Sequence, residues 1–364
     1  MRVVIDATPL LVRSAGVKNY LYYWIQHLRL AAGIHSIGTF PNFDGLHPLQ
    51  HERSVAGFWH TWSGLGSLAL ANRTPLPVTD WWARGADVFH ASNLLEHPPR
   101  HLRLTATIHD MTSWLMPELH ARGNLRADRR FLEICKRADK LIAVSQSTKD
   151  DAVRLAGLPP DKIVVIHSGV PDAFFTVNPD AIRRVRQRHA LQRPFVLFVG
   201  TIEPRKNIDT LLDAWAALPP SLREEYELVI AGPAGWASPA TIERLRAVRY
   251  LGYIPEPDLA PLTAAAAVFV YPSLYEGFGF PVAQAMAARV PVVTSNLSSL
   301  PEVAGDAALL VDPRSTSELL AALSRLLLSP DLRSELAARG RCRARDFRWE
   351  TCAAKSLQFF EEVL

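Results

Sequence analysis

Short apolar runs alternate with longer amphipathic stretches along almost the whole chain. Apolar runs bounded by polar or glycine-containing turns predict buried strands, whereas apolar residues at every third or fourth position predict helices. In the first half, the runs expected to be strands are Val3–Ile5, Ala86–Phe89, Leu104–Ile108, Leu141–Val144 and Ile163–Ile166. This alternation is typical of an α/β fold in which a parallel sheet is covered by helices on both faces.

The same pattern restarts in the second half. The strands expected there are Phe195–Val199, Glu227–Ala231, Val248–Gly252, Ala267–Tyr271, Val290–Thr294 and Ala308–Val311, with helices near Ile208–Ala217 and Ser315–Leu328. A connector containing Pro171 and Asp172 separates the two series. We therefore expect two Rossmann-like domains, residues 1–172 and 173–348, followed by a last helix over residues 349–364. Ligand sites are expected in the loops at the carboxyl ends of the strands.

Composition narrows the class of protein only modestly. The 364 residues, 48% hydrophobic and 21% charged, describe a globular chain with a substantial core. A net charge of +4 is too small to favour nucleic acid; it suits an anionic small molecule or weak attraction to an anionic membrane surface. The three cysteines form neither a metal-binding spacing nor an even disulfide framework. We therefore expect a cytoplasmic protein, and peripheral contact with the inner face of the membrane stays open.

The segment Tyr271–Ala287 is the most informative stretch of the chain. An apolar run leads into a turn with one acid, Glu276, and two glycines, Gly277 and Gly279, and a helical pattern follows at once. Such a junction directs unpaired backbone N–H groups and the positive end of a helix dipole at one place, which suits an anion or a sugar hydroxyl. A tight connection without a ligand is the alternative, but a carboxylate in the turn must find a hydroxyl, a cation or water.

A second loop carries two adjacent cations. Residues Gly200–Asn207 end the first strand of the second half, and Arg205 and Lys206 precede an expected helix. An arginine fork and a lysine point charge are suited to holding a diphosphate. Two solvated surface cations are the alternative. No pair of carboxylates that could hold a divalent metal is expected beside them.

An aromatic cluster and a basic stretch stand apart from these motifs. Trp59, Trp62, Trp81 and Trp82 are four of the nine tryptophans. We expect them to be buried between a helix and a sheet, with stacking on an acceptor sugar or a membrane interface as alternatives. The basic residues between 122 and 140 are interrupted by acids, so a solvated helix face explains them, and a face against a membrane stays open.

Together, the Glu276 turn and the Arg205–Lys206 loop resemble the signature of retaining glycosyltransferases of family 4. Members of this family have the GT-B fold, two Rossmann-like domains that face each other across a cleft. The resemblance implies transfer of a hexose from a nucleotide diphosphate sugar to a glycan or lipid-linked glycan acceptor. Residues 200–207 resemble bacterial mannosyltransferases of polysaccharide assembly, so mannose from GDP-mannose is the first expectation. Rhamnose, glucose and N-acetylglucosamine donors remain open.

The resemblance also implies roles for single residues. Glu276 would orient the donor sugar, Arg205 and Lys206 would stabilise the leaving diphosphate, and His109 would reach toward the donor sugar. The family's second acid, which binds the ribose, is replaced here by Gln284, an amide that can still hydrogen-bond a diol. The other donor-binding positions are Gly16, Val17, Gly200, Tyr253, Ile254, Gly277, Phe278 and Gly279.

The family pattern further implies a metal-independent enzyme that needs no cofactor besides its donor, and a last helix (349–364) that crosses back to the first domain. Asp110 is expected to be structural, and Ser145 to cap the helix that follows it. Two alternatives stay open. The chain could be a non-catalytic homologue that binds nucleotide sugars, or an epimerase or phosphorylase of the same fold, although no motif for a pyridoxal phosphate lysine is present.

Overall fold

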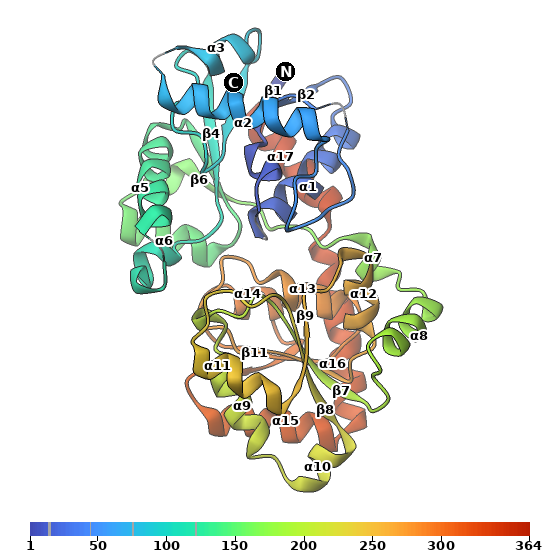
Figure 1. The fold of residues 1–364 in the computed structure, drawn as a ribbon. Coiled ribbons are helices and arrows are strands. Elements are labelled where there is room, and N and C mark those ends of the chain that lie inside the picture. The colour runs from blue at the N-terminus through green and yellow to red at the C-terminus, as the bar shows by residue number, and fades with distance from the viewer. Residues whose placement is uncertain (14–15, 44, 75, 121) are drawn as a thin grey trace. The chain divides into compact units, whose positions relative to one another are not determined.

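The computed structural model describes residues 1–13, 16–43, 45–74, 76–120 and 122–364, and the chain forms two compact units (Figure 1). The first unit is Met1–Gly169 together with Trp349–Leu364, and the second is Val170–Arg348. The division falls three residues before the expected boundary, because the connector is held by the second unit. There the Val170 N–H donates to the Phe347 carbonyl at 2.9 Å, and Asp172 pairs with Arg348 at 2.6 Å.

The first unit is built on one parallel sheet with the strand order β2–β1–β3–β4–β5–β6. Its strands are β1 (Arg2–Asp6), β2 (Ser36–Phe40), β3 (Val88–Ala91), β4 (Arg103–Ile108), β5 (Lys140–Ala143) and β6 (Ile163–Val165). Its α-helices are α1 (Gly16–Ala31), α2 (Phe58–Arg73), α3 (Val78–Trp82), α4 (Thr112–Leu115), α5 (Arg122–Arg137), α6 (Gln146–Ala156) and α17 (Trp349–Glu361), and its 3-10 turns are η1 (Thr8–Leu11), η2 (Pro117–Leu119) and η3 (Pro160–Lys162).

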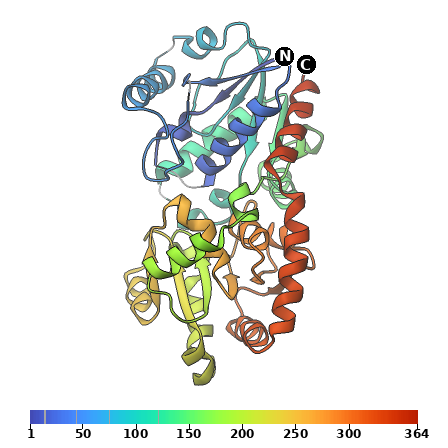
Figure 2. The ribbon, with the colours of Figure 1, turned by 90° about the vertical axis from the view of Figure 1, so that its right-hand side faces the viewer.

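Alternation along the strands of this sheet supplies two apolar faces. Leu104, Ala106 and Ile108 of β4 point to the face that is covered by α2, α3, α5 and α6. On the other face, α1 and α17 run side by side (Figure 2). The Trp24 indole of α1 donates to the Ser356 hydroxyl of α17 at 2.9 Å, which helps fix the last helix to the first unit.

The second unit repeats the architecture with the strand order β12–β11–β10–β7–β8–β9. Its strands are β7 (Phe195–Val199), β8 (Glu227–Ala231), β9 (Arg249–Gly252), β10 (Val268–Tyr271), β11 (Val292–Ser295) and β12 (Ala308–Val311), all parallel. Its α-helices are α7 (Asp172–Phe175), α8 (Pro179–Arg188), α9 (Ile208–Ala216), α10 (Pro220–Glu225), α11 (Pro239–Arg244), α12 (Glu256–Ala264), α13 (Phe280–Ala287), α14 (Leu300–Ala304), α15 (Thr316–Leu328) and α16 (Pro330–Arg343), and its 3-10 turns are η4 (Pro204–Lys206), η5 (Leu245–Ala247) and η6 (Ala344–Asp346).

The strand order of the second sheet decides where its site lies. Counted from β7, the order is that of the doubly wound dinucleotide-binding fold, and the chain reverses its direction of travel between β7 and β10. These two central strands are hydrogen-bonded neighbours, so the loops that leave their carboxyl ends emerge next to each other. Ligands bind at this kind of switch point.

The predicted α/β architecture is confirmed, with one strand missed. Strand β2, Ser36–Phe40, was not expected, because its five residues mix polar residues and a glycine with only two large apolar side chains. It lies at the edge of the sheet with β1 as its partner, where a short polar strand is tolerated. No helix in the described part of the chain is long and apolar enough to cross a membrane.

Candidate active site

Two loops of the second unit come together where β7 and β10 end. The Leu274 N–H in the loop after β10 donates to the Arg205 carbonyl in the loop after β7 at 2.8 Å. The Asn207 side-chain amide donates to the Pro272 carbonyl at 3.1 Å and to the Pro313 carbonyl at 2.6 Å. Asn207 has a left-handed backbone (φ 58°) that ends η4 and starts α9. These bonds fix the two loops to each other without any ligand.

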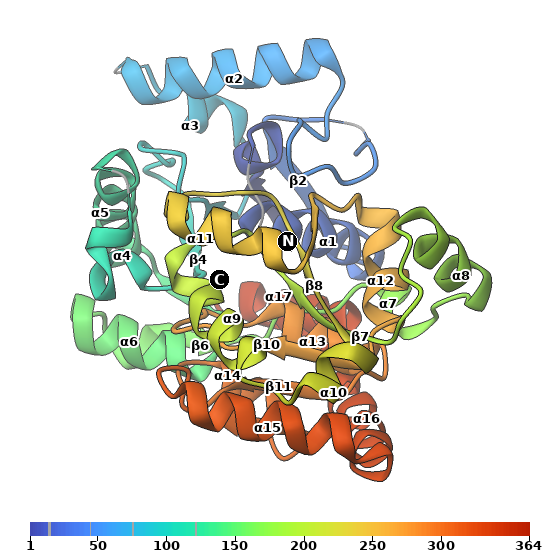
Figure 3. The ribbon, with the colours of Figure 1, turned by 60° about the horizontal axis from the view of Figure 1, so that its bottom comes forward.

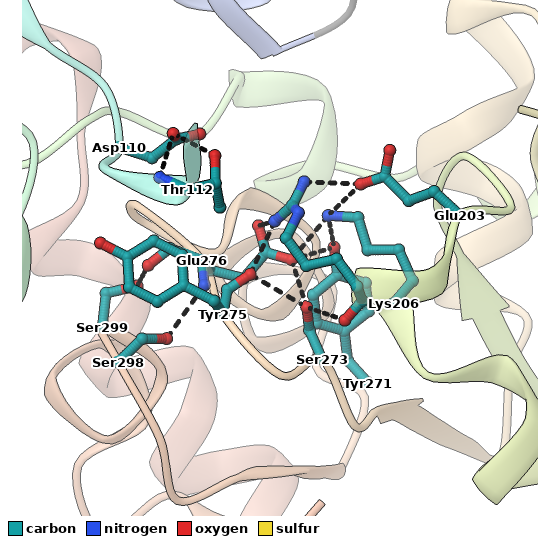
Figure 4. Close-up of polar contacts among 11 residues, drawn as sticks. Asp110, Thr112, Glu203, Lys206, Tyr271, Ser273, Tyr275, Glu276, Ser298 and Ser299 are labelled. Carbon is teal, nitrogen blue, oxygen red and sulfur yellow. Dashed lines mark hydrogen bonds and ion pairs between the residues drawn. The ribbon is translucent and has the colours of Figure 1, made fainter. Parts of the chain in front are cut away.

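Four charged side chains meet between the loops (Figure 4). Lys206 Nζ lies 2.6 Å from Glu276 Oε1 and 3.9 Å from Glu203 Oε1. Arg205 bridges the same two acids, with Nη2 at 2.7 Å from Glu203 Oε1 and Nη1 at 3.0 Å from Glu276 Oε2. Arg205 Nη1 also donates to the Tyr275 carbonyl at 2.6 Å. Two cations and two anions thus form one closed cluster whose formal charges cancel.

The cluster is largely removed from water. The side chains of Glu203, Lys206 and Glu276 are at most 10% exposed, and Arg205 is the most open at 19%. Burial by itself raises the pKa of the Glu276 carboxyl, but the charges of Arg205 and Lys206 outweigh it and hold that pKa at about 2. Burial and the Arg205 charge lower the pKa of Lys206, and the two carboxylates oppose this shift. Glu276 is therefore ionised at neutral pH.

Neutral groups complete the shell around Glu276. The Tyr271 and Ser273 hydroxyls donate to Oε1 at 3.0 and 2.7 Å. Burial and the nearby carboxylate raise the pKa of Tyr271, so its hydroxyl keeps its proton. The Glu276 backbone is held as well, since its N–H donates to the Ser298 hydroxyl at 3.0 Å and its carbonyl accepts from the Ser299 hydroxyl at 2.9 Å. The position of the carboxylate is thus set by side chains from both loops and by its own backbone.

Two glycines shape the backbone around this cluster. Gly279 has φ 95° at the N-cap of α13, and a Cβ there would lie 2.7 Å from Leu300 Cδ2. Gly232, which follows β8, has φ 140°, and a Cβ there would lie 1.9 Å from the Gly200 carbonyl oxygen. Only glycine allows this close approach. Gly232 was not singled out from the sequence, because its role depends on a loop from another strand.

The other predicted donor-binding residues of the second unit lie in or after the loops at the carboxyl ends of its strands. Gly200 follows β7, and its N–H donates to the Ala231 carbonyl at 2.9 Å. Tyr253 and Ile254 follow β9, and Gly277 and Phe278 lie in the turn after Glu276. The Phe278 ring packs edge-on against Phe280 and Phe347, and the Ile254 side chain is 6% exposed. These two side chains belong to the core. Gln284 lies on α13 and is 5% exposed.

The first unit carries the remaining predicted residues. Gly16 and Val17 open α1, directly after residues 14–15, which lie outside the described part of the chain. A Cβ at Gly16 would meet nothing within 4 Å, so packing within the chain does not require glycine there. His109 follows β4 and lies edge-on to the Tyr20 ring of α1, with centroids 4.8 Å apart. Burial lowers the pKa of His109 to about 4, against the opposing charge of Asp110, so the ring is neutral at pH 7.

Two smaller predictions in this unit are confirmed. The Ser145 hydroxyl accepts from the Thr148 N–H at 3.0 Å and caps α6. Asp110 accepts from the Thr112 N–H at 3.0 Å just before α4, which is a structural role (Figure 4).

One acid of the cluster, Glu203, was not singled out from the sequence. Its backbone is extended before η4, and its side chain accepts from Arg205. The only signal for it in the sequence was an acid two residues before an arginine in a strand-end loop. Lys206 Nζ and the Arg205 guanidinium occupy the space between Glu203 and Glu276, and no group of three or more potential metal ligands occurs among the described residues.

The tryptophan cluster is not buried. Trp59 is 79% exposed, Trp62 62% and Trp81 59%. The other side of α2 faces inward at Gly64, where a Cβ would lie 2.6 Å from Leu11 Cδ1. This close approach fixes the orientation of the helix, so its aromatic side, formed by Phe58, Trp59 and Trp62, faces solvent. The basic residues of α5 are a solvated face as expected; Arg126 and Arg129 are exposed.

Similarity to known proteins places the chain in a family. The model for glycosyltransferase family 4 matches residues 14–174, and the model for glycosyl transferases group 1 matches residues 181–343. The O-antigen chain mannosyltransferase B of Escherichia coli is 31% identical over 381 residues, covering 99% of this chain and 100% of that protein. The chain therefore belongs to the family 4 glycosyltransferases, as its motifs predicted, and it has the GT-B fold.

Two further similarities fit this assignment. The serotype-specific mannosyltransferase WbdA of Escherichia coli is 28% identical over 242 residues, which cover 63% of this chain but only 29% of that longer protein. Among solved structures, a sucrose-phosphate synthase from Thermosynechococcus elongatus superposes with a TM-score of 0.73 at 21% identity, covering 100% of this chain and 98% of that one. At this identity the structural match speaks for the fold alone.

Proposed function

We propose that this glycosyltransferase transfers mannose from GDP-mannose, with retention of the anomeric configuration, to a glycan or lipid-linked glycan acceptor of surface polysaccharide assembly. The observation that carries the proposal is the meeting of Arg205, Lys206 and Glu276 at the switch point of the second sheet. The choice of mannose rests on the two relatives named as mannosyltransferases, one of which matches over its whole length.

The proposed reaction follows from the chemistry of these groups. The acceptor oxygen bonds to the anomeric carbon from the face that the diphosphate leaves, and the bond from that carbon to the phosphate oxygen breaks. The acceptor proton passes to the leaving phosphate oxygen. Arg205 and Lys206 stabilise the negative charge that develops there. Glu276, held ionised, accepts hydrogen bonds from donor-sugar hydroxyls and fixes the sugar for attack.

Other residues would bind the donor without taking part in the bond changes. Gln284 would hydrogen-bond the ribose diol. Gly277 and Gly279 lie in the turn before α13, and Gly16 and Val17 open α1 in the first unit; these four residues would lie close to the donor. The neutral ring of His109 would contact the donor sugar. We propose no metal or further cofactor for the reaction.

A donor screen tests the proposal. Calorimetry of the full chain with GDP, UDP, ADP and dTDP should show the tightest binding for GDP, and GDP-mannose should be consumed in the presence of lipid-linked oligosaccharide acceptors. NMR of the product should show the anomeric configuration of the donor, and EDTA should not stop transfer. Preference for another nucleotide would overturn the donor assignment. Tight nucleotide-sugar binding without transfer to any acceptor would favour the binding-module alternative.

The aromatic side of α2 supports a peripheral contact of this enzyme with an anionic membrane. Seven of the fourteen large apolar side chains exposed in the described residues lie within 58–82: Phe58, Trp59, Trp62, Leu70, Leu76, Trp81 and Trp82. Helix α2 contains no acid and ends at the exposed Arg73. The exposed Arg53 and Arg84 lie near it in the sequence, as do the acids Glu52 and Asp80. Figure 3 shows α2 with α3 packed along it. Tryptophan and phenylalanine beside arginine suit the interfacial zone of a bilayer.

Vesicle sedimentation tests this contact. The wild type should sediment with vesicles of phosphatidylglycerol and phosphatidylcholine but not with phosphatidylcholine alone. Trp59→Ser with Trp62→Ser should reduce sedimentation about tenfold. Trp236→Ser, which removes an indole that is 56% exposed in the second unit, is the matched control and should not. Equal sedimentation of all three proteins would overturn the contact. Loss of transfer to a short water-soluble acceptor, with sedimentation unchanged, would instead assign the aromatic side to the acceptor glycan.

A further inference from the structure

Glu203 is the one member of the charged cluster to which the proposed reaction gives no task. Its side chain is 5% exposed, and a carboxylate this buried needs charged partners. It accepts from Arg205 Nη2 at 2.7 Å and lies 3.9 Å from Lys206 Nζ. These are the two cations expected to meet the leaving diphosphate.

The charges around this acid balance in the free protein. Arg205 and Lys206 contribute two positive charges, and Glu203 and Glu276 contribute two negative ones, all within hydrogen-bonding or ion-pair distance of a neighbour. A diphosphate that enters such a site meets a cluster with no net charge. Without Glu203, the same diphosphate would meet an excess of one positive charge in a site shielded from water, where charges interact strongly.

This balance matters for turnover because a transferase must release its nucleotide diphosphate product. Binding energy that is equally strong before and after the reaction does not accelerate it, and a tightly held product slows the next cycle. A fixed negative charge 2.7 Å from Arg205 and 3.9 Å from Lys206 weakens the hold of these cations on any diphosphate. Charge that builds up only while the sugar–phosphate bond breaks is still met by preplaced donors.

We infer that Glu203 is a positioning residue with two effects: it orients the Arg205 guanidinium toward the Glu276 turn, and it limits the affinity of the site for the nucleoside diphosphate product. The orientation is visible in the structure, since Arg205 Nη1 reaches the Tyr275 carbonyl at 2.6 Å and Glu276 Oε2 at 3.0 Å while Nη2 is held by Glu203. This inference rests on the proposed function of the same site.

The substitution Glu203→Gln tests the charge separately from the shape. Glutamine has nearly the same size and keeps a carbonyl that accepts from Arg205, but it carries no charge. We expect the variant to bind GDP about tenfold more tightly than the wild type in calorimetry. GDP should inhibit its transfer reaction at correspondingly lower concentration, and kcat should fall. Glu203→Asp, which restores the charge, should return GDP affinity toward the wild-type value.

An exposed acid far from the cluster in the sequence, Glu243, provides the control. Glu243→Gln removes an exposed acid of the same unit, paired with Arg246 at 2.8 Å, and should leave GDP affinity unchanged. If Glu203→Gln keeps its melting temperature but binds GDP more weakly or equally, the inference is wrong, because a purely structural acid predicts weaker or unchanged binding. If the wild type binds no nucleoside diphosphate at all, the proposed function itself fails, which calorimetry of the unmodified protein shows first.

Discussion

Lys206 Nζ lies 2.6 Å from Glu276 Oε1, although the two residues are 70 positions apart in the chain. Each leaves the carboxyl end of one of the two central strands of the second sheet, β7 and β10, which are neighbours. The ion pair therefore forms at the switch point of a doubly wound sheet, where ligands bind. Under the proposed function, the cation for the diphosphate and the acid for the sugar are held in place before either ligand binds.

Replacing either cation should cost transition-state stabilisation. We expect Arg205→Ala and Lys206→Ala each to lower kcat/KM by an amount equivalent to about 2–4 kcal/mol, the scale for removing one preplaced donor to a developing negative charge. Arg246→Ala, which removes an arginine whose side chain is 78% exposed in the same unit, is the matched control and should keep full activity. Steady-state kinetics with saturating acceptor measure this. Wild-type kinetics in both cation variants would exclude the assigned roles.

The proposed contact between Gln284 and the ribose predicts a substitution that does not weaken nucleotide binding. If Gln284 contacts the ribose as proposed, Gln284→Glu should leave GDP affinity unchanged or tighten it, because a carboxylate accepts both hydrogens of a diol. Calorimetry with GDP and with GDP-mannose checks this. Loss of nucleotide binding in a variant with an unchanged melting temperature would show that this part of the pocket does not recognise a ribose.

The stability of the second unit should depend on pH through Glu276. Its folded-state pKa of about 2 lies below the ordinary value of 4.5, so the unfolded chain binds more protons between these values. The contribution of Glu276 is therefore fully present above pH 4.5 and is lost as the pH falls toward 2, and it is at most about 3 kcal/mol. Denaturation by urea should show a flatter acid limb for Glu276→Gln than for the wild type. Equal slopes for the two proteins would mean that groups other than Glu276 cause the loss of stability in acid.

Two glycines with positive φ distinguish the cost of backbone strain from the cost of a steric clash. Gly232→Ala should destabilise the second unit by more than about 3 kcal/mol, because its Cβ would lie 1.9 Å from the Gly200 carbonyl oxygen in addition to the strain at φ 140°. Gly252→Ala, with φ 68° and nothing within 4 Å of the new Cβ, should cost only about 1 kcal/mol. Chemical denaturation of both variants gives the comparison. Similar losses would mean that the loop of Gly232 moves aside without cost.

The sequence determined the architecture and the family. Apolar runs of strand length separated by helical patterns specify buried parallel strands, since such strands must be apolar on both faces. Eleven of the twelve strands that the described residues form were expected on that basis. The exception, Ser36–Phe40, lies at a sheet edge, where burial does not demand an apolar run. The local motifs around Arg205, Lys206 and Glu276 indicated the family because their chemistry is carried by short contiguous segments.

How these motifs meet depends on packing between segments that are distant in the sequence. No spacing in the chain shows that Glu276 meets Arg205 and Lys206, or that Gly232 must leave room for the Gly200 carbonyl, because each of these contacts joins loops that follow different strands. The same holds for the tryptophans of α2. Their composition favoured burial, but the close approach of Gly64 to Leu11 turns the opposite side of the helix inward and leaves Trp59 and Trp62 in solvent. Local pattern sets which elements form, and packing between distant elements sets which side chains face one another.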